Sequence, residues 1–155
     1  MTDIDFRSRD LTEKRLSNLD PCEFDFLGYR CQSIEGVLQS LKFKDLATQI
    51  KIIQMSGFEA KRAGRNVPWQ TLNFCGLEID RFGEFYQAFL SDLYFTMFEQ
   101  NQSKLLLLLS SSNLDHSIGH NNKDKTILTK TEFIFHLNDV KLHFSKQQGF
   151  ISYVS

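Results

Sequence analysis

Residues 32–43, Gln-Ser-Ile-Glu-Gly-Val-Leu-Gln-Ser-Leu-Lys-Phe, carry the pattern that decides the fold of this chain. The apolar residues of the stretch recur at the spacing of one helix face: Ile34, Val37, Leu38 and Leu41. Ser33 precedes the first of them, and its hydroxyl can accept a hydrogen bond from a free backbone N–H of the first turn. The stretch therefore predicts a short amphipathic helix with Ser33 as its N-cap.

The polar residues of the same stretch form a second stripe. Glu35, Gln39 and Lys42 are four and then three residues apart, so they fall on one face of the helix. Glu35 lies in the first turn, where the positive end of the helix dipole favours its ionised form. An acid, an amide and an amine in a row are typical of a solvated helix flank. They are also the residue types of a polar site, and spacing alone leaves both interpretations open.

Length and composition describe an ordinary globular protein. The chain has 155 residues, enough for one domain with a buried core, and it is 41% apolar and 24% charged. Its net charge of −1 argues against binding nucleic acid through a global positive field, although a local patch remains compatible with it. Its three cysteines include no Cys-x-x-Cys pair, which indicates a reducing compartment.

The sequence also predicts a cytoplasmic protein without a membrane partner. The first residues are too polar for a signal peptide. The longest apolar run, residues 105–109, is far shorter than a membrane span.

Periodicity and turn signals predict the remaining elements. Residues 22–26 and 29–31 flank Leu27-Gly28 and predict an aromatic-rich β-hairpin. Capping boxes at residues 56–59 and 129–132 open two helices, and we expect the first of these helices to end at Gly64 in the left-handed conformation. The expected helices are residues 44–55, 58–63, 81–99, 103–111 and 130–143.

The helix expected at residues 81–99 is the longest, with Asp80 as its cap and a wide apolar face that includes Phe82, Phe85, Phe89 and Leu93. We expect the helix at residues 103–111 to be buried on most sides. Residues 66–76 are expected to form a loop that carries the only tryptophan, Trp69, and a lone tryptophan in a loop is more often packed against the core than used for stacking on a ligand.

Together these features predict a predominantly helical α+β fold: a single compact domain with a small N-terminal β-hairpin. We expect residues 1–16 to be an N-terminal extension whose first residues fray, residues 17–144 to be the domain, and residues 145–155 to be a C-terminal edge strand or loose tail. His116 and His120 have a spacing that metal ligands use, but no His-Glu-x-x-His pattern is present, and no metal site is predicted.

Several motifs, in order, resemble the YbiA-like family, also called NADAR. They are Ser17-Asn18, the aromatic hairpin of residues 24–29, the Glu35, Gln39, Lys42-Phe43 helix, Ala60 with Gly64-Arg65, Trp69, and Phe98 before the leucine run. The resemblance covers residues 17–140 and implies a YbiA-like fold for the domain.

That family is associated with cleavage of N-glycosidic bonds. Its substrates include ADP-ribose attached to guanine in nucleic acid and phosphoribosyl pyrimidine intermediates of riboflavin synthesis. The resemblance therefore implies an N-glycosidase-like hydrolase that acts on an ADP-ribosyl or phosphoribosyl conjugate. It implies no cofactor and no metal, a small-molecule nucleotide or ADP-ribosyl substrate as partner, and nucleic acid only as a substrate.

The resemblance also implies roles for individual residues. Glu35 would be the acid or base near the anomeric carbon, and Lys42 an amine nucleophile toward an opened ribose aldehyde. The expected substrate-binding residues are Gln39 for ribose hydroxyls, Arg65 and Lys61 for phosphate, Trp69 for a base, and Asn18, His116 and Asn122. A basic end of the helix at residues 58–63 is also ordinary dipole complementarity.

Two departures from the family pattern bear on activity. The family's His directly after the Glu is Gly36 here, and its Trp-Gly-Asp-Gly and Gly-Lys-x-Asn-x-x-Gly stretches are replaced by the shorter residues 115–122. A glycine inside a helix costs up to about 1 kcal/mol against alanine, which suggests that something packs close to Gly36. The alternatives are thus a catalytically impaired relative that binds a nucleotide, an ADP-ribose-like ligand or a protein partner, and a helical interaction protein that shares only the architecture.

Overall fold

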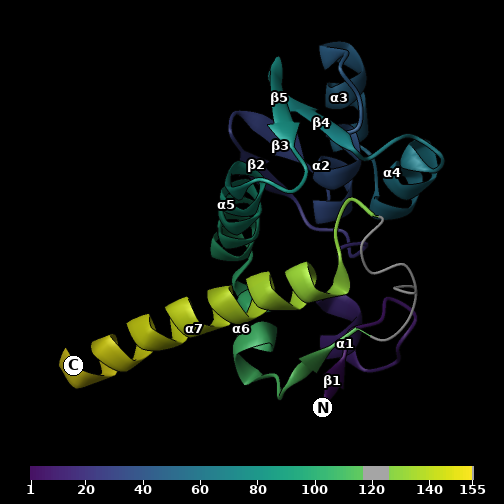
Figure 1. Cartoon of the computed structure of the whole chain (residues 1–155). Coiled ribbons are helices and arrows are strands. Elements are labelled where there is room, and N and C mark those ends of the chain that lie inside the picture. The colour runs from purple at the N-terminus through teal and green to yellow at the C-terminus, as the bar shows by residue number, and fades with distance from the viewer. Residues whose placement is uncertain (117–125, 155) are drawn as a thin grey trace.

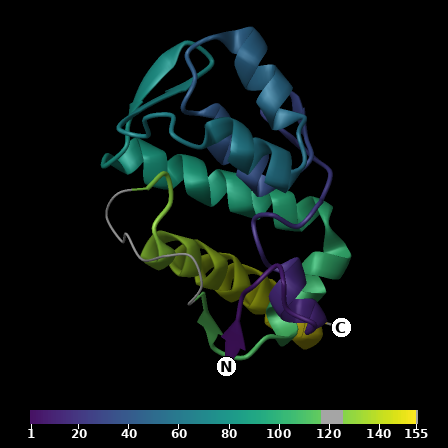
Figure 2. The same ribbon diagram turned by 90° about the vertical axis from the view of Figure 1, so that its right-hand side faces the viewer.

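Helix α5 (Glu84–Gln100) is the central element of the chain in a computed structural model that describes residues 1–116 and 126–154, with side chains to residue 147. Figure 2 shows α5 between a group of shorter helices on one side and the C-terminal helix on the other. Its buried residues are Tyr86, Phe89, Leu90, Leu93, Tyr94, Met97 and Phe98. The predicted wide apolar face is therefore present.

Two aromatic residues assigned to that face point elsewhere. Phe82 and Phe85 are 72% and 59% exposed. Phe82 precedes the helix, which starts three residues later than expected, and its backbone N–H donates to the Asp80 carboxylate. The N-cap of α5 is accordingly Gly83 and not Asp80.

Three helices form the layer that contains residues 32–43: α2 (Ile34–Ser40), α3 (Leu46–Ile53) and α4 (Gly57–Gly64). Helix α2 packs against both of the others (Figure 1). Its N-cap is Ser33, whose hydroxyl accepts from the Gly36 N–H as predicted. The Ser56 capping box likewise opens α4.

Two β-hairpins lie beside this layer. β2 (Phe24–Phe26) and β3 (Tyr29–Cys31) pair antiparallel around Leu27-Gly28, both with positive φ, and this hairpin was predicted. β4 (Thr71–Phe74) and β5 (Leu77–Asp80) pair in the same way around Cys75-Gly76, where a simple loop was expected. The second hairpin was missed because its strands are short and a cysteine occupies the first turn position, where Asn or Asp is the usual signal.

The opposite layer contains the two ends of the chain (Figure 1). It consists of α1 (Leu11–Arg15), α6 (Gln102–Ser110), α7 (Lys130–Val154), and a short parallel pair of β1 (Thr2–Asp3) with β6 (Leu114–Asp115). Helix α6 buries Leu105 and Leu108 but leaves Leu106 59% exposed, so it is less enclosed than the leucine run suggested.

Three local expectations are wrong. The N-terminal residues do not fray, because β1 pairs with β6 and Ile4 is fully buried. The last residues continue α7 and form no edge strand. Gly64 ends α4 without a left-handed conformation, which is adopted instead by Asn66 at φ 66°.

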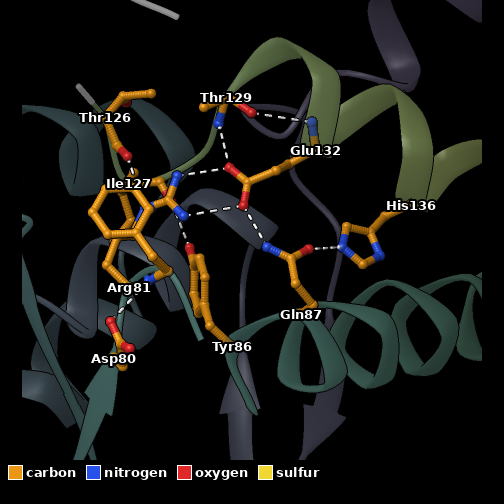
Figure 3. A network of polar contacts seen from close by, with 10 residues as sticks. Asp80, Arg81, Tyr86, Gln87, Thr126, Ile127, Thr129, Glu132 and His136 are labelled. Carbon is orange, nitrogen blue, oxygen red and sulfur yellow. Dashed lines mark hydrogen bonds and ion pairs between the residues drawn. The ribbon is translucent and has the colours of Figure 1, made fainter. Parts of the chain in front are cut away.

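A buried polar network joins α5 to α7 (Figure 3). The Arg81 guanidinium donates two hydrogen bonds, of 3.0 and 2.6 Å, to the Glu132 carboxylate. Gln87 donates to the same carboxylate and bonds His136 on its other side at 3.0 Å. The Thr129 capping box completes the arrangement, since Thr129 and Glu132 exchange side-chain and backbone hydrogen bonds. The first turn of α7 is thereby fastened to the segment that precedes α5.

Among the described residues, no helix is both long enough and apolar enough to cross a membrane.

Candidate functional site

The first turn of α2 fixes the position of Glu35. The Glu35 N–H donates to the Asn18 carbonyl at 3.1 Å, so the helix start is attached to the Ser17-Asn18 turn. The Asn18 side chain in turn accepts from the Tyr94 hydroxyl of α5 at 2.8 Å, and Tyr94 is fully buried. The Glu35 backbone is therefore held by a contact that leads into the core of the molecule.

The Glu35 carboxylate is partly buried and hydrogen-bonded. Gln39, one turn along α2, donates from Nε2 to Glu35 Oε1 at 2.9 Å. Burial raises the pKa of Glu35 above its ordinary value, while the Gln39 hydrogen bond, Lys61 and then Lys42 oppose that rise. The net effect is a carboxyl group that keeps its proton to a higher pH than an exposed glutamate.

Lys42 follows the last turn of α2 and is also partly buried. Its Nζ donates to the Gly64 carbonyl at the end of α4, at 3.0 Å. Burial lowers the pKa of this amine, and the attraction of Glu35 opposes the shift. A larger fraction of Lys42 is therefore neutral near pH 7 than for an exposed lysine.

Gln39 lies between these two groups and is 5% exposed. Its Oε1 is buried and has no hydrogen-bond partner among the described residues. A buried amide oxygen without a donor is uncommon, and such atoms are frequently found where a ligand or water completes the site.

Gly36 is explained by the neighbouring helix. A Cβ at this position would lie 3.1 and 3.2 Å from the Ile52 and Ile53 carbonyl oxygens of α3. The expectation that something packs close to Gly36 is thus confirmed. The same close contact means that α2 approaches α3 at Gly36, the position where the YbiA-like pattern has a histidine.

The other residues assigned to the site lie in different places. Lys61 is exposed on α4 and acts on Glu35 through its charge. Arg65 is exposed just after α4, and within the described residues no hydrogen bond or ion pair connects it with Glu35, Gln39 or Lys42. Trp69 is half-buried against the core, with its ring edge-to-face with Phe82 at 6.0 Å.

His116 belongs to the opposite layer. Its Nδ1 is hydrogen-bonded to the Ile4 carbonyl, and its ring contacts Phe133 of α7. Asn122 and His120 fall outside the described residues. The structure therefore gathers Asn18, Glu35, Gln39, Lys42 and Lys61. In the described part of the chain Arg65 and Trp69 form no hydrogen bond or ion pair with these residues, and His116 lies in the opposite layer.

Residues 11–141 match the model of a family described as bacteriophage protein GP30.3. The chain belongs to the GP30.3 family. A relative from Enterobacteria phage T4, a 17.1 kDa protein of the Gp30–rIII intergenic region, is 34% identical over 130 residues, which cover 79% of this chain and 86% of the relative.

The solved structure of YbiA from E. coli is similar in fold to this GP30.3-family chain. Its TM-score is 0.65, and the match covers 96% of this chain and 88% of YbiA at 17% sequence identity. The YbiA-like fold and the α+β class expected from the motifs are confirmed. At this level of identity the similarity establishes the fold and leaves the chemistry to be argued from the site.

Tyr94 and Gly64 are site residues that the sequence reasoning did not identify. Tyr94 lies within the helix expected at residues 81–99, where only apolar packing was considered, although a buried tyrosine hydroxyl needs a hydrogen-bond partner. Gly64 was interpreted as a helix stop. In the structure its carbonyl accepts a hydrogen bond from Lys42, and the absence of a side chain leaves room for Gln39. Only the packing of α4 on α2 reveals this contact.

Proposed function

We propose that this chain is an N-glycosidase-like hydrolase that acts on an ADP-ribosyl or phosphoribosyl conjugate, with Glu35 as its acid or base. The observation that supports this function is a partly buried carboxyl group whose pKa is raised by burial and which is held by Gln39. General acid–base catalysis needs a positioned group that can carry its proton near the working pH. Glu35 is held by Gln39, and burial moves its pKa upward, in the direction that such a role needs.

The lysines near Glu35 suit an anionic substrate. In our proposal Lys61, in the C-terminal half of α4, and Arg65, just after α4, are both exposed and contact phosphate groups of the conjugate. Lys42, whose pKa is lowered by burial, is the amine that attacks an opened ribose aldehyde. Trp69 would stack on the base, and Gln39 would bind ribose hydroxyls.

The function is tested by incubating the purified chain with ADP-ribosylated guanine nucleotides and with phosphoribosyl pyrimidines, and measuring released ADP-ribose or ribose phosphate. Glu35→Gln should lower the rate by about 100-fold or more, the range of general acid–base contributions. Glu84→Gln is a matched control, because Glu84 also lies in the first turn of a helix but is exposed. Equal rates for wild type and Glu35→Gln would remove the proposed role.

A second candidate is a relative that binds a nucleotide or ADP-ribose-like ligand without turnover. It is favoured by Gly36, because the carbonyls of α3 occupy the space beside the position where the YbiA-like pattern has a histidine. Calorimetry with ADP-ribose separates the two candidates. Heat of binding without product supports the second, and no binding of any nucleotide counts against both.

A further inference from the structure

Gly64 contacts the candidate site in two ways. Its carbonyl oxygen accepts the hydrogen bond from Lys42 Nζ at 3.0 Å. Its missing side chain leaves the space that the Gln39 carboxamide occupies, because a Cβ on Gly64 would lie 1.7 Å from Gln39 Oε1 and 2.6 Å from Gln39 Cδ. One residue of α4 therefore meets both Lys42 and the amide that binds Glu35.

The backbone gives no other reason for a glycine here. Gly64 is the last residue of α4, and its φ is not among the positive values, which in the described residues occur at Gly28 and Gly76 for glycine. Alanine is the better helix former at such a position. The space taken by Gln39 accounts for the glycine.

We infer that Gly64 is a positioning residue, which keeps the Gln39 carboxamide in contact with the Glu35 carboxylate. Its meaning for catalysis rests on the proposed function, whereas the contact itself does not. The clash that a methyl group would create is with the far end of a flexible side chain, so Gly64→Ala should fold with the carboxamide rotated away. The hydrogen bond from Gln39 Nε2 to Glu35 Oε1 is then lost.

Loss of the hydrogen bond from Gln39 should change the pKa of Glu35 in a direction that can be measured. The Gln39 hydrogen bond lowers the pKa of Glu35, so breaking it should raise that pKa further. The Gly64 carbonyl remains in the Gly64→Ala chain, so the hydrogen bond that it accepts from Lys42 Nζ should persist. A general disturbance of α4 would break both contacts.

The test is a double-mutant cycle read by NMR titration of the Glu35 carboxyl carbon in the full chain. We expect Gly64→Ala and Gln39→Ala to give upward shifts of similar size, and the double variant to titrate like Gln39→Ala alone. Ala63→Ser adds an atom at the neighbouring position of α4 and should leave the titration of Glu35 unchanged. The inference would be overturned if the Glu35 carboxyl of Gly64→Ala titrated as in the wild type. It would also be overturned if the pKa shifts of the two single variants added in the double variant.

Folding gives a second readout that needs no activity. If Gly64→Ala is too strained to fold, adding Gln39→Ala should restore the fold, because the shorter side chain vacates the contested space. A double variant as unfolded as Gly64→Ala would contradict the assignment.

Activity then distinguishes this inference from the proposed function. If the chain is a hydrolase, Gly64→Ala should lower kcat by up to ~100-fold, the scale reached when a reacting group is displaced by about 1 Å. The part of the pH dependence of kcat that reflects ionisation of Glu35 should shift to higher pH in this variant, because the pKa of Glu35 is expected to rise. If Glu35→Gln leaves the rate unchanged while the NMR cycle behaves as expected, the proposed function fails and the positioning contact stands.

Discussion

Glu35 has an environment in which ionisation works against folding. Its pKa is raised in the folded chain mainly by burial, against the opposing effects of Gln39, Lys61 and Lys42. The folded state therefore binds the proton more tightly than the unfolded state does, so stability falls as pH rises from the ordinary glutamate pKa, about 4.5, through the raised one.

The direction of this pH dependence of stability gives a prediction for Glu35→Gln. The variant should have a higher free energy of unfolding than wild type at pH 8, because the uncharged amide avoids the burial cost, and an equal one at pH 3, where Glu35 is protonated in both states. Urea unfolding at the two pH values measures the difference. Glu84→Gln, at an exposed position in the first turn of a helix, is the control variant. A variant less stable than wild type at pH 8 would mean that the charged carboxylate favours the fold.

Between elements, the ion pair of Arg81 with Glu132 links the segment before α5 to the first turn of α7. Both side chains are largely buried, at 3% and 15% exposure. Burial by itself raises the pKa of Glu132, but hydrogen bonds from Arg81, the Thr129 N–H and Gln87 outweigh it and leave the pKa below its ordinary value. The stabilisation is therefore present above about pH 4.5 and is lost as pH falls through the lower folded pKa.

Glu132→Gln should destabilise the chain by about 3–5 kcal/mol at pH 7, because it leaves the buried Arg81 charge without its partner. Glu23→Gln breaks an ion pair with Arg30 that is about half exposed, and it should cost less than about 1 kcal/mol. Chemical unfolding of the two variants at pH 7 compares them directly. Similar small losses would show that the network of Figure 3 contributes little to stability.

At the scale of the whole molecule, the N-terminal strand closes the layer that contains α6 and α7. Ile4 is fully buried, and the Ile4 N–H and carbonyl bond Asp115 and His116. A segment that looked like a frayed extension is thus part of the core. His116 links this strand to the start of α7 through its hydrogen bond to the Ile4 carbonyl and its ring contact with Phe133.

We expect Ile4→Ala to lower the free energy of unfolding by about 2–5 kcal/mol, the cost of removing a large side chain from a packed core. Met1→Ala removes an apolar side chain that is 82% exposed, three residues away, and should change stability by no more than about 0.5 kcal/mol. Thermal or urea unfolding measures both. A loss for Ile4→Ala as small as that for Met1→Ala would mean that residues 1–10 are dispensable.

Signals that act over a few residues predicted their elements correctly. The caps at Ser33, Ser56 and Thr129 satisfy backbone N–H groups within their own first turn, so the sequence shows them directly. The hairpin at Leu27-Gly28 and the apolar face of α5 are local or periodic in the same sense. These local patterns predict a predominantly helical α+β domain, and the YbiA-like fold was expected from the resemblance of the motifs to that family.

The candidate site was only partly predictable. Spacing on one helix placed Glu35, Gln39 and Lys42 together, because side chains three or four residues apart share a face. It could not show whether Arg65, Trp69 or His116 would meet them, since each lies on another element whose position is set by packing. Gly64 was interpreted only as a helix stop for the same reason, because its contact with Gln39 is made between two different helices.

The sequence by itself therefore determined helices α2 to α7, the caps at Ser33, Ser56 and Thr129, one hairpin and the polar stripe of residues 35–42. The tertiary structure decided which groups surround that stripe: the carbonyls of α3 beside Gly36, the Gly64 contacts of α4, and Tyr94 behind Asn18. The physical reason is how far apart along the chain the interacting residues lie. Caps and periodicity depend on neighbours along the chain, whereas the burial that shifts the pKa values of Glu35 and Lys42 exists only when distant elements pack together.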